Sequence, residues 1–265
     1  MARNPLIVKL WGVLESEDPN SVNAQIAKIL IKNRRNMEHT TSTYLAKLCN
    51  VSTPSISRFS RILGYENFFD FRVDLKRYVP NRGRRFTAMI EGASDNLFDN
   101  YTDYIYKNLS FLNDADFRQS VQELVADMRT YATIYFMGNM QSGNTAMEME
   151  YQLCSVKPDI IALNGYSRQK ELLHNLKPDV LYVIFSVSGD YLKIYFREDE
   201  KLEKAKGSKI WMITSEPTAQ KTAELDGLIN TKTGHEGEDT TISQEITANL
   251  ITTLYFRQLY DKNVK

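Results

Sequence analysis

The hydrophobic positions of residues 41–63 follow the spacing of two short helices joined by a turn. In the first helix Leu45 and Leu48 would face inward, and residues 49–51 would make the turn. The second helix has apolar residues at i, i+3 and i+7, which are Ile56, Phe59 and Leu63. This spacing places the three side chains on one side of an α-helix. The pattern therefore predicts a helix-turn-helix.

The opposite face of the second helix carries hydroxyl and arginine side chains. Its candidate DNA-contacting residues are Ser52, Thr53, Ser55, Ser57, Arg58 and Arg61. A helix in the major groove presents its N-terminal residues to base edges, where hydroxyls and arginine bond to bases or phosphates. Ser52 would cap this helix, and Pro54 is tolerated because first-turn amides lack intrahelical partners. The alternative is an ordinary helical hairpin with a solvated basic face.

Two further amphipathic segments flank this pair of helices. Residues 21–33 carry an apolar stripe after a candidate cap at Ser21, and a second stripe runs from Asn67 until Pro80 ends it. These segments bring the total to four or five short helices. We therefore expect residues 1–79 to form an all-α helix-turn-helix bundle.

The next segment, residues 80–96, contains Pro, two glycines and three arginines without a clean periodicity. We interpret it as a linker. Its basic half would either clamp DNA phosphates or serve as a solvated hinge.

The hydrophobic positions of residues 97–265 follow a different pattern. A helical stretch from about Leu97 to Met128 precedes five apolar runs separated by helix-length segments. These runs cover residues 132–137, 160–163, 180–187, 210–213 and 227–230. Short buried strands alternating with helices predict an α/β domain, a doubly wound five-stranded parallel sheet with helices on both faces.

Ligands of such sheets bind at the carboxyl ends of the strands. The loops after the first and third strands read GNMQSGNT from Gly138 and SVSGDY from Ser186. Both are rich in Gly and Ser, so backbone amides, hydroxyls and a helix N-terminus could converge on an anion. The pair of loops indicates a phosphate site, whereas either loop alone is typical of a tight turn.

Composition narrows the class of protein. The 265 residues are 42% hydrophobic and 25% charged, values typical of a soluble globular protein of one large or two modest domains. No apolar run approaches the roughly 18 residues of a membrane span, and we see no signal-peptide core. Cys49 and Cys154 lie far apart, and His39 and His174 are isolated, so neither a disulfide scaffold nor a metal site is indicated. We expect a cytoplasmic protein.

The net charge of zero hides an asymmetry between the two halves. Residues 1–85 contain 15 Lys and Arg against 7 Asp and Glu, a net charge of +8, and residues 86–265 carry −8. A basic module suits a polyanion, whereas an acidic one would be repelled by it. The charge distribution therefore favours the N-terminal half as the part that contacts DNA.

The stretch VSTPSISRFSRILGY, from Val51, is followed by a Phe-rich helix and resembles the N-terminal domain of the RpiR/MurR family of bacterial transcription regulators. The second half resembles the sugar isomerase (SIS) domain that this family joins to it. The resemblance covers nearly the whole chain. It implies a homodimer or tetramer that binds a palindromic DNA operator and senses a phosphorylated sugar or related metabolite. It implies no cofactor, catalytic residue, metal or membrane association.

Two family motifs carry the implied effector site. The pattern G-x-G-x-S begins at Gly138, and S-x-S-G-x-T begins at Ser186. The effector-binding residues implied by the resemblance are Gly138, Ser142, Ser186, Ser188 and Gly189. Met140 replaces the second glycine and Tyr191 replaces the threonine, and Asp190 would repel a dianion if it pointed inward. The serines would otherwise only cap helices and turns.

Three alternatives stay open. The SIS half could have lost its ligand and serve as a dimerisation scaffold, which the replacements at Met140 and Tyr191 favour. It could be an adaptor for a protein partner, or a phosphosugar isomerase. An isomerase needs a base beside the sugar carbons. Its candidate residues are His235, Glu236, Glu238 and Asp239, although a charged, glycine-punctuated loop is more often simply solvated.

Overall fold

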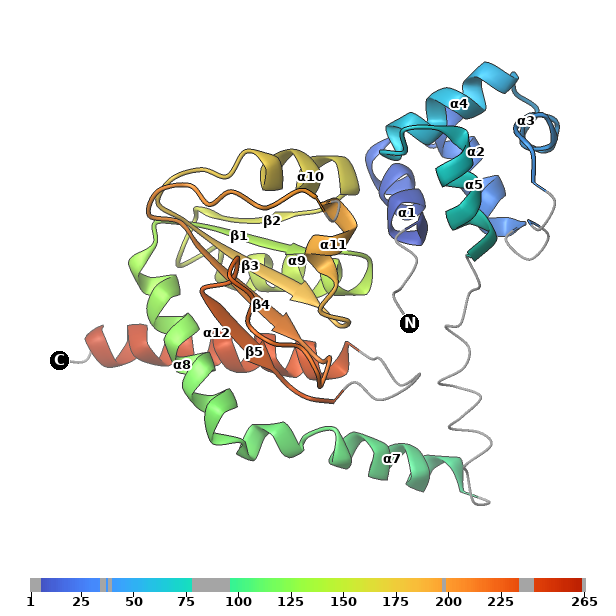
Figure 1. The fold of residues 1–265 in the computed structure, drawn as a ribbon. Helices are drawn as coiled ribbons and strands as arrows, with labels where there is room; N and C mark the ends of the chain where they lie inside the picture. The colour runs from blue at the N-terminus through green and yellow to red at the C-terminus, as the bar shows by residue number, and fades with distance from the viewer. Residues whose placement is uncertain are drawn as a thin grey trace. The chain divides into compact units, whose positions relative to one another are not determined.

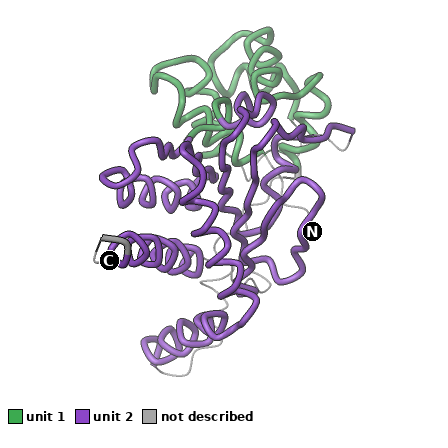
Figure 2. The backbone as a smooth tube through the Cα atoms, turned by 90° about the vertical axis from the view of Figure 1, so that its left-hand side faces the viewer, with its two compact units in different colours: residues 1–81, 164–168 green, residues 82–163, 169–265 purple. Residues whose placement is uncertain are grey.

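The computed structural model divides into two compact units (Figure 2). The first comprises residues 1–81 and 164–168, and the second comprises residues 82–163 and 169–265. The residues that the structure describes are 6–33, 37, 40–77, 96–196, 199–233 and 241–263. The predicted linker therefore lies outside the described residues, except for Asn96.

The described part of the first unit is all-α, as predicted (Figure 1). Its helices are α1 (Leu6–Ser16), α2 (Val22–Lys32), α3 (Ser42–Cys49), α4 (Thr53–Ile62) and α5 (Phe68–Arg77). Ser21 caps α2 as expected, because its side chain accepts a hydrogen bond from the amide of Ala24 at 3.0 Å. The predicted inward residues Leu45, Ile56 and Phe59 all lie in one buried core.

The second unit contains a five-stranded, entirely parallel sheet (Figure 1). Its strands are β1 (Thr133–Gly138), β2 (Ile160–Leu163), β3 (Val180–Ser186), β4 (Lys209–Thr214) and β5 (Gly227–Asn230). They lie in the order β2-β1-β3-β4-β5. Each strand falls within one residue of its predicted bounds, which confirms the expected fold class.

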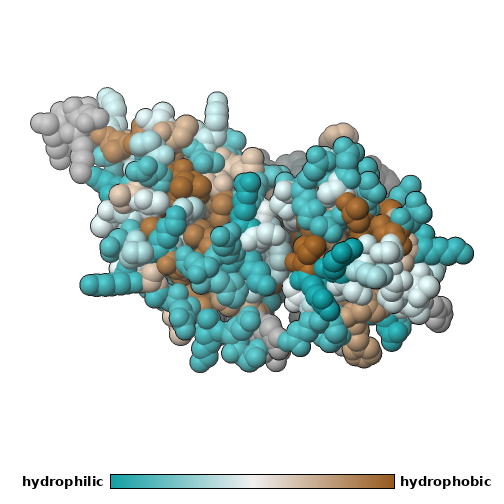
Figure 3. Space-filling view, turned by 90° about the horizontal axis from the view of Figure 1, so that it is seen from above, coloured by the Kyte–Doolittle hydropathy of each residue, from teal (hydrophilic) through white to brown (hydrophobic). Residues whose placement is uncertain are grey.

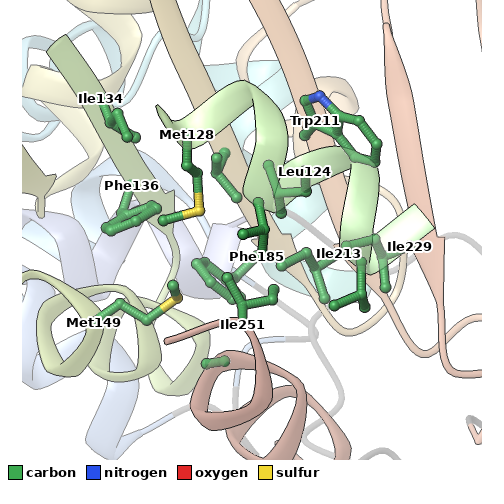
Figure 4. Packing of buried hydrophobic residues seen from close by; sticks show 14 of the residues in the cluster. Leu124, Met128, Ile134, Phe136, Met149, Phe185, Trp211, Ile213, Ile229 and Ile251 are labelled. Carbon is green, nitrogen blue, oxygen red and sulfur yellow. The ribbon is translucent and has the colours of Figure 1, made fainter. Parts of the chain in front are cut away.

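Helices cover both faces of the sheet. On one face α8 (Ala115–Thr130), α9 (Gln141–Leu153) and α12 (Ile242–Asn263) enclose the main hydrophobic core. Figure 4 shows that Leu124, Met149 and Ile251 from these helices meet Phe136 and Phe185 from the strands. On the other face lie α10 (Tyr166–His174) and α11 (Tyr191–Tyr195).

The predicted helical stretch from Leu97 to Met128 is interrupted. It consists of α7 (Leu97–Lys107), a 3₁₀ turn (Ser110–Asn113) and α8. Asp114 restarts the helix because its carboxylate accepts hydrogen bonds from the amides of Asp116 at 2.8 Å and Phe117 at 3.1 Å. The side-chain hydrogen bond from Lys232 is the largest cause that lowers the pKa of Asp114, so this cap stays ionised.

The face of the molecule seen in Figure 3 is mixed in character. In Figure 3 small apolar patches, drawn in brown, alternate with hydrophilic side chains. Among the described residues, no helix is both long and apolar enough to cross a membrane.

Asp127 at the end of α8 ties this helix to β4. Its carboxylate accepts hydrogen bonds from Trp211 Nε1 at 2.9 Å and from Lys209 Nζ at 2.7 Å. Asp127→Ala leaves the indole N–H of a buried tryptophan without its acceptor, so it should lower the free energy of unfolding by about 1–3 kcal/mol. Denaturant titration measures this loss. Asp127→Asn keeps an oxygen acceptor and should lose less; equal losses in both variants would contradict this role of the hydrogen bond.

Candidate functional sites

The turn between α3 and α4 is built by local backbone and capping interactions. Thr41 caps α3 by accepting a hydrogen bond from the amide of Tyr44 at 3.0 Å. The helix ends at Asn50, which adopts left-handed angles (φ 52°, ψ 47°) that asparagine tolerates better than most residues. The amide of Val51 then donates to the carbonyl of Ala46 at 2.9 Å. These contacts fix the direction in which the chain enters α4.

The N-terminus of α4 carries a small network of hydroxyls. Ser52 is its N-cap, as predicted, and accepts a hydrogen bond from the amide of Ser55 at 3.3 Å. The Ser52 and Ser55 hydroxyls lie 2.9 Å apart, and Arg58 Nη2 donates to Ser55 Oγ at 3.3 Å. The network therefore holds the Arg58 guanidinium back toward the first turn of the helix.

All six predicted DNA-contacting residues, the N-cap Ser52 and five residues of α4, lie outside the buried core. Ser52, Thr53, Arg58 and Arg61 are exposed, and Ser55 and Ser57 are partly exposed. The Ser57 hydroxyl donates to the carbonyl of Thr53 at 3.4 Å, a local contact that leaves this face open. The arrangement can present hydroxyl and guanidinium donors and acceptors to a groove of DNA.

The sequence analysis missed Tyr44, in the first turn of α3. Its side chain is 43% exposed, and Lys47 on the same helix is also exposed. The helix that precedes a recognition helix crosses the DNA backbone. Tyr44 and Lys47 are therefore candidate phosphate contacts. The signal in the sequence was an aromatic residue outside the apolar stripe of α3.

The second candidate site lies at the carboxyl ends of β1 and β3, and we call the region of residues 138–142 and 186–191 the crevice, after the place where ligands of such sheets bind. In the order β2-β1-β3-β4-β5 the topological switch point falls between these two strands. The chain continues from β1 into α9 on one face and from β3 into α11 on the other. The two Gly- and Ser-rich loops, which the sequence analysis placed at the ends of two strands of one sheet, therefore begin side by side.

Two residues of the first loop, which follows β1, have backbone geometry that suits glycine. A Cβ atom at Gly138 would lie 2.6 Å from the backbone carbonyl of Ser142, so only glycine fits there. Met140 adopts φ 56° and ψ −118°, a conformation that glycine favours and that is strained for methionine. The loop therefore keeps a glycine-type backbone at the position where the RpiR/MurR pattern has glycine.

The predicted serines have different surroundings. Ser142 is buried, and its hydroxyl donates to Gln244 Oε1 of α12 at 2.9 Å, which joins α9 to α12. Ser186 is buried at the end of β3. Ser188 is partly exposed and accepts a hydrogen bond from the amide of Asp190 at 3.4 Å. Ser188 is thus the most accessible of the three hydroxyls.

Asp190 and Tyr191 follow Ser188 and Gly189. The carboxylate of Asp190 pairs with Lys193 Nζ at 2.7 Å, which offsets its charge. Tyr191 is 1% exposed, and its hydroxyl donates to Gln169 Oε1 of α10. Burial is the largest cause that raises the pKa of Tyr191 well above its ordinary value, so the phenol stays neutral and remains a donor. The side chain that replaces threonine therefore points inward.

The loop proposed for an isomerase base lies outside the described residues, because residues 234–240 contain all four candidates. Among the residues that the structure describes, no group of His, Cys, Asp and Glu is arranged to hold a metal ion.

The geometry defines a class of protein in which a helix-turn-helix unit is joined to a parallel α/β unit. Residues 16–82 match the model of the helix-turn-helix domain of the rpiR family. This match confirms the resemblance for residues 16–82.

The HTH-type transcriptional regulator GlvR of Bacillus subtilis (strain 168) is 26% identical over 172 residues, which are 64% of this chain and 63% of that protein. The chain thus matches less than two thirds of that relative.

Two solved structures also resemble the chain. The Vibrio vulnificus NanR protein complexed with ManNAc-6P is 14% identical, with a TM-score of 0.48 over 97% of this chain and 93% of that one. The sugar isomerase domain of an RpiR transcription factor from Sphaerobacter thermophilus is 15% identical, with a TM-score of 0.46 over 60% and 88%.

The strained backbone of Met140 makes a prediction about stability. Met140→Gly relieves the positive-φ strain and should raise the free energy of unfolding by about 1 kcal/mol. This net gain already subtracts the stability that is lost because glycine adds conformational entropy to the unfolded chain. Met140→Ala is the matched control, because it removes the same side chain beyond Cβ and keeps the strain. Thermal and denaturant unfolding compare the two variants. A glycine variant no more stable than the alanine variant would show that strain is not stored at this position.

Proposed function

We propose that this protein is a transcription regulator that binds operator DNA through α4 and responds to a phosphorylated sugar or related metabolite through its second unit. The observation that carries the proposal is the rpiR-type helix-turn-helix domain, whose α4 exposes its hydroxyls and arginines. The net charge of +8 in residues 1–85 supports attraction to DNA. Such a protein works in the cytoplasm, where the DNA is.

The operator would be a palindrome read by the two copies of a homodimer, or by pairs of copies in a tetramer. Half-sites read by paired recognition helices lie about 34 Å apart, one turn of DNA, or a multiple of it. Ligand binding that changes the spacing of two α4 helices by a few ångströms would weaken both contacts together. This couples the second unit to DNA without a direct contact between ligand and DNA.

The proposed ligand site is the crevice between β1 and β3. Gly138, Ser186, Ser188 and Gly189 would surround the ligand, and the amides in the first turn of α9 would favour an anionic group. Ser142 would act indirectly, because its hydroxyl is bonded to Gln244 and so fixes α9 against α12. A regulator of this kind catalyses no reaction on the ligand.

A second candidate function follows from Tyr191. Its buried ring and its bond to Gln169 leave no threonine-like hydroxyl in the β3 loop. This favours a regulator in which the parallel-sheet unit is a dimerisation scaffold without a ligand. The two functions differ in whether any small molecule changes operator affinity.

Arg58 gives the sharpest test of DNA reading. Arg58→Ala should weaken operator binding by about 1–3 kcal/mol if the guanidinium makes a bidentate hydrogen bond to a base. The effect on random duplex DNA should be smaller. Fluorescence anisotropy on both duplexes measures the two affinities. Arg257→Ala, an exposed arginine of α12, should bind both duplexes as wild type does. An unchanged affinity of Arg58→Ala for both duplexes would exclude Arg58 from the interface.

Ser188 tests the ligand site. A ligand at about 100 times its dissociation constant stabilises the folded state by roughly 2.7 kcal/mol, so a sugar phosphate that binds should raise the melting temperature. Ser188→Ala should reduce this rise, and the exposed Ser155→Ala should not. Thermal-shift assays against a panel of sugar phosphates measure it. A rise that survives in Ser188→Ala would place the ligand elsewhere, and no rise with any compound would favour the scaffold.

A further inference from the structure

The side chain of Gln169 connects the loop after β1 to the loop after β3. Its side chain is 1% exposed and uses both ends of its amide. Nε2 donates to the carbonyl of Gly138 at 2.8 Å, and Oε1 accepts a hydrogen bond from the hydroxyl of Tyr191. One buried side chain of α10 therefore links the last residue of β1 to the first residue of α11.

Tyr195 adds a second link. Its hydroxyl donates to Asn139 Oδ1 at 2.6 Å and lies 3.2 Å from Gln169 Oε1. The rings of Tyr191 and Tyr195 are 4.9 Å apart, and both side chains are buried. The two tyrosines of α11 thus fill the space next to the β1 loop, at the switch point where ligands of such sheets bind.

One donor in this network has no acceptor. Asn139 Nδ2 is buried and makes no hydrogen bond among the described residues, although Oδ1 of the same amide is bonded. A buried donor without a partner costs free energy, so its position beside the crevice favours a ligand oxygen as the missing partner.

We propose that Tyr191 and Tyr195 form a latch that closes the crevice, and that a ligand binds by displacing them from Gln169 and Asn139. The proposal rests on the ligand-sensing function proposed above and adds the step that controls it. The ligand supplies an oxygen acceptor, from a phosphate or a sugar hydroxyl, to Asn139. Because the open form is a minor state of the free protein, the latch lowers the apparent affinity by the fraction that is open.

The latch also couples the ligand to the fold. Tyr191 is the first residue of the five-residue helix α11, directly after the β3 loop, so its release moves this loop. Gln169 would lose its bonds to α11 but keep its bond to Gly138, so α10 stays attached to β1. Ligand binding thus moves one short helix and leaves the sheet in place.

The test is ligand affinity in variants that open the latch by different amounts. Tyr191→Thr removes the ring and keeps a small hydroxyl, and it should bind glucose 6-phosphate at least about tenfold more tightly than wild type. Tyr191→Phe keeps the ring, loses the bond to Gln169, and should show a smaller gain. Isothermal titration calorimetry with glucose 6-phosphate, and separately with inorganic phosphate, gives the dissociation constants. A gain with both probes assigns the acceptor to the phosphate, and a gain with the sugar phosphate alone assigns it to the sugar.

The matched control is Tyr182→Phe. Tyr182 is a buried tyrosine of β3, and its hydroxyl contacts the backbone of Lys177, before the start of that strand. This variant loses the hydroxyl of another buried tyrosine without touching the latch and should bind as wild type does. If Tyr191→Thr does not fold, the double variant Tyr191→Phe with Tyr195→Phe keeps both rings, removes every hydroxyl of the latch and should bind more tightly than wild type.

The outcomes separate the latch from the proposed function. Rising affinity in the order wild type, Tyr191→Phe, Tyr191→Thr supports the latch. Equal affinity in all three overturns the latch and leaves the sensing function in place. Absence of binding in all three, together with no thermal shift for any sugar phosphate of the panel and with operator binding intact, overturns both the latch and the response to phosphorylated sugars.

Discussion

Burial of the parallel sheet on both faces is the constraint on which the second unit depends. Every residue of β3 is buried, and β1 and β4 are buried along most of their length. Parallel strands need crossover connections, and both faces of the sheet must be covered with helices. In this strand order the chain leaves β1 toward one face and β3 toward the other. The crevice therefore results from the same requirement that buries the core.

The strands were predictable because a strand buried on both faces is a continuous apolar run. Residues 180–187 needed no alternation to be recognised, and the structure assigns β3 to Val180–Ser186. The helix-turn-helix was predictable because its signals are local: the cap Ser52, and a period of three to four residues in α4. The break between α7 and α8 was missed, because the apolar spacing continues across it.

The polar network of the crevice was not predictable for a different reason. Gln169 and Gly138 are 31 residues apart, and a glutamine in an amphipathic helix is normally a surface residue. The sequence showed that Tyr191 lacks the hydroxyl of a threonine, but not that its own hydroxyl turns toward α10. Likewise, Ser142 matched a motif by position while its hydroxyl contacts α12. Motif spacing predicts which loop a residue occupies, whereas the direction of its side chain depends on distant partners.

The central claim of this account is that α4 reads DNA sequence. It is tested most directly by selection of duplexes from a random-sequence pool with the full chain, followed by sequencing of the bound fraction. The account predicts an enriched inverted repeat whose half-site centres lie one helical turn, or a multiple of it, apart. A bound fraction without any enriched sequence would contradict the claim.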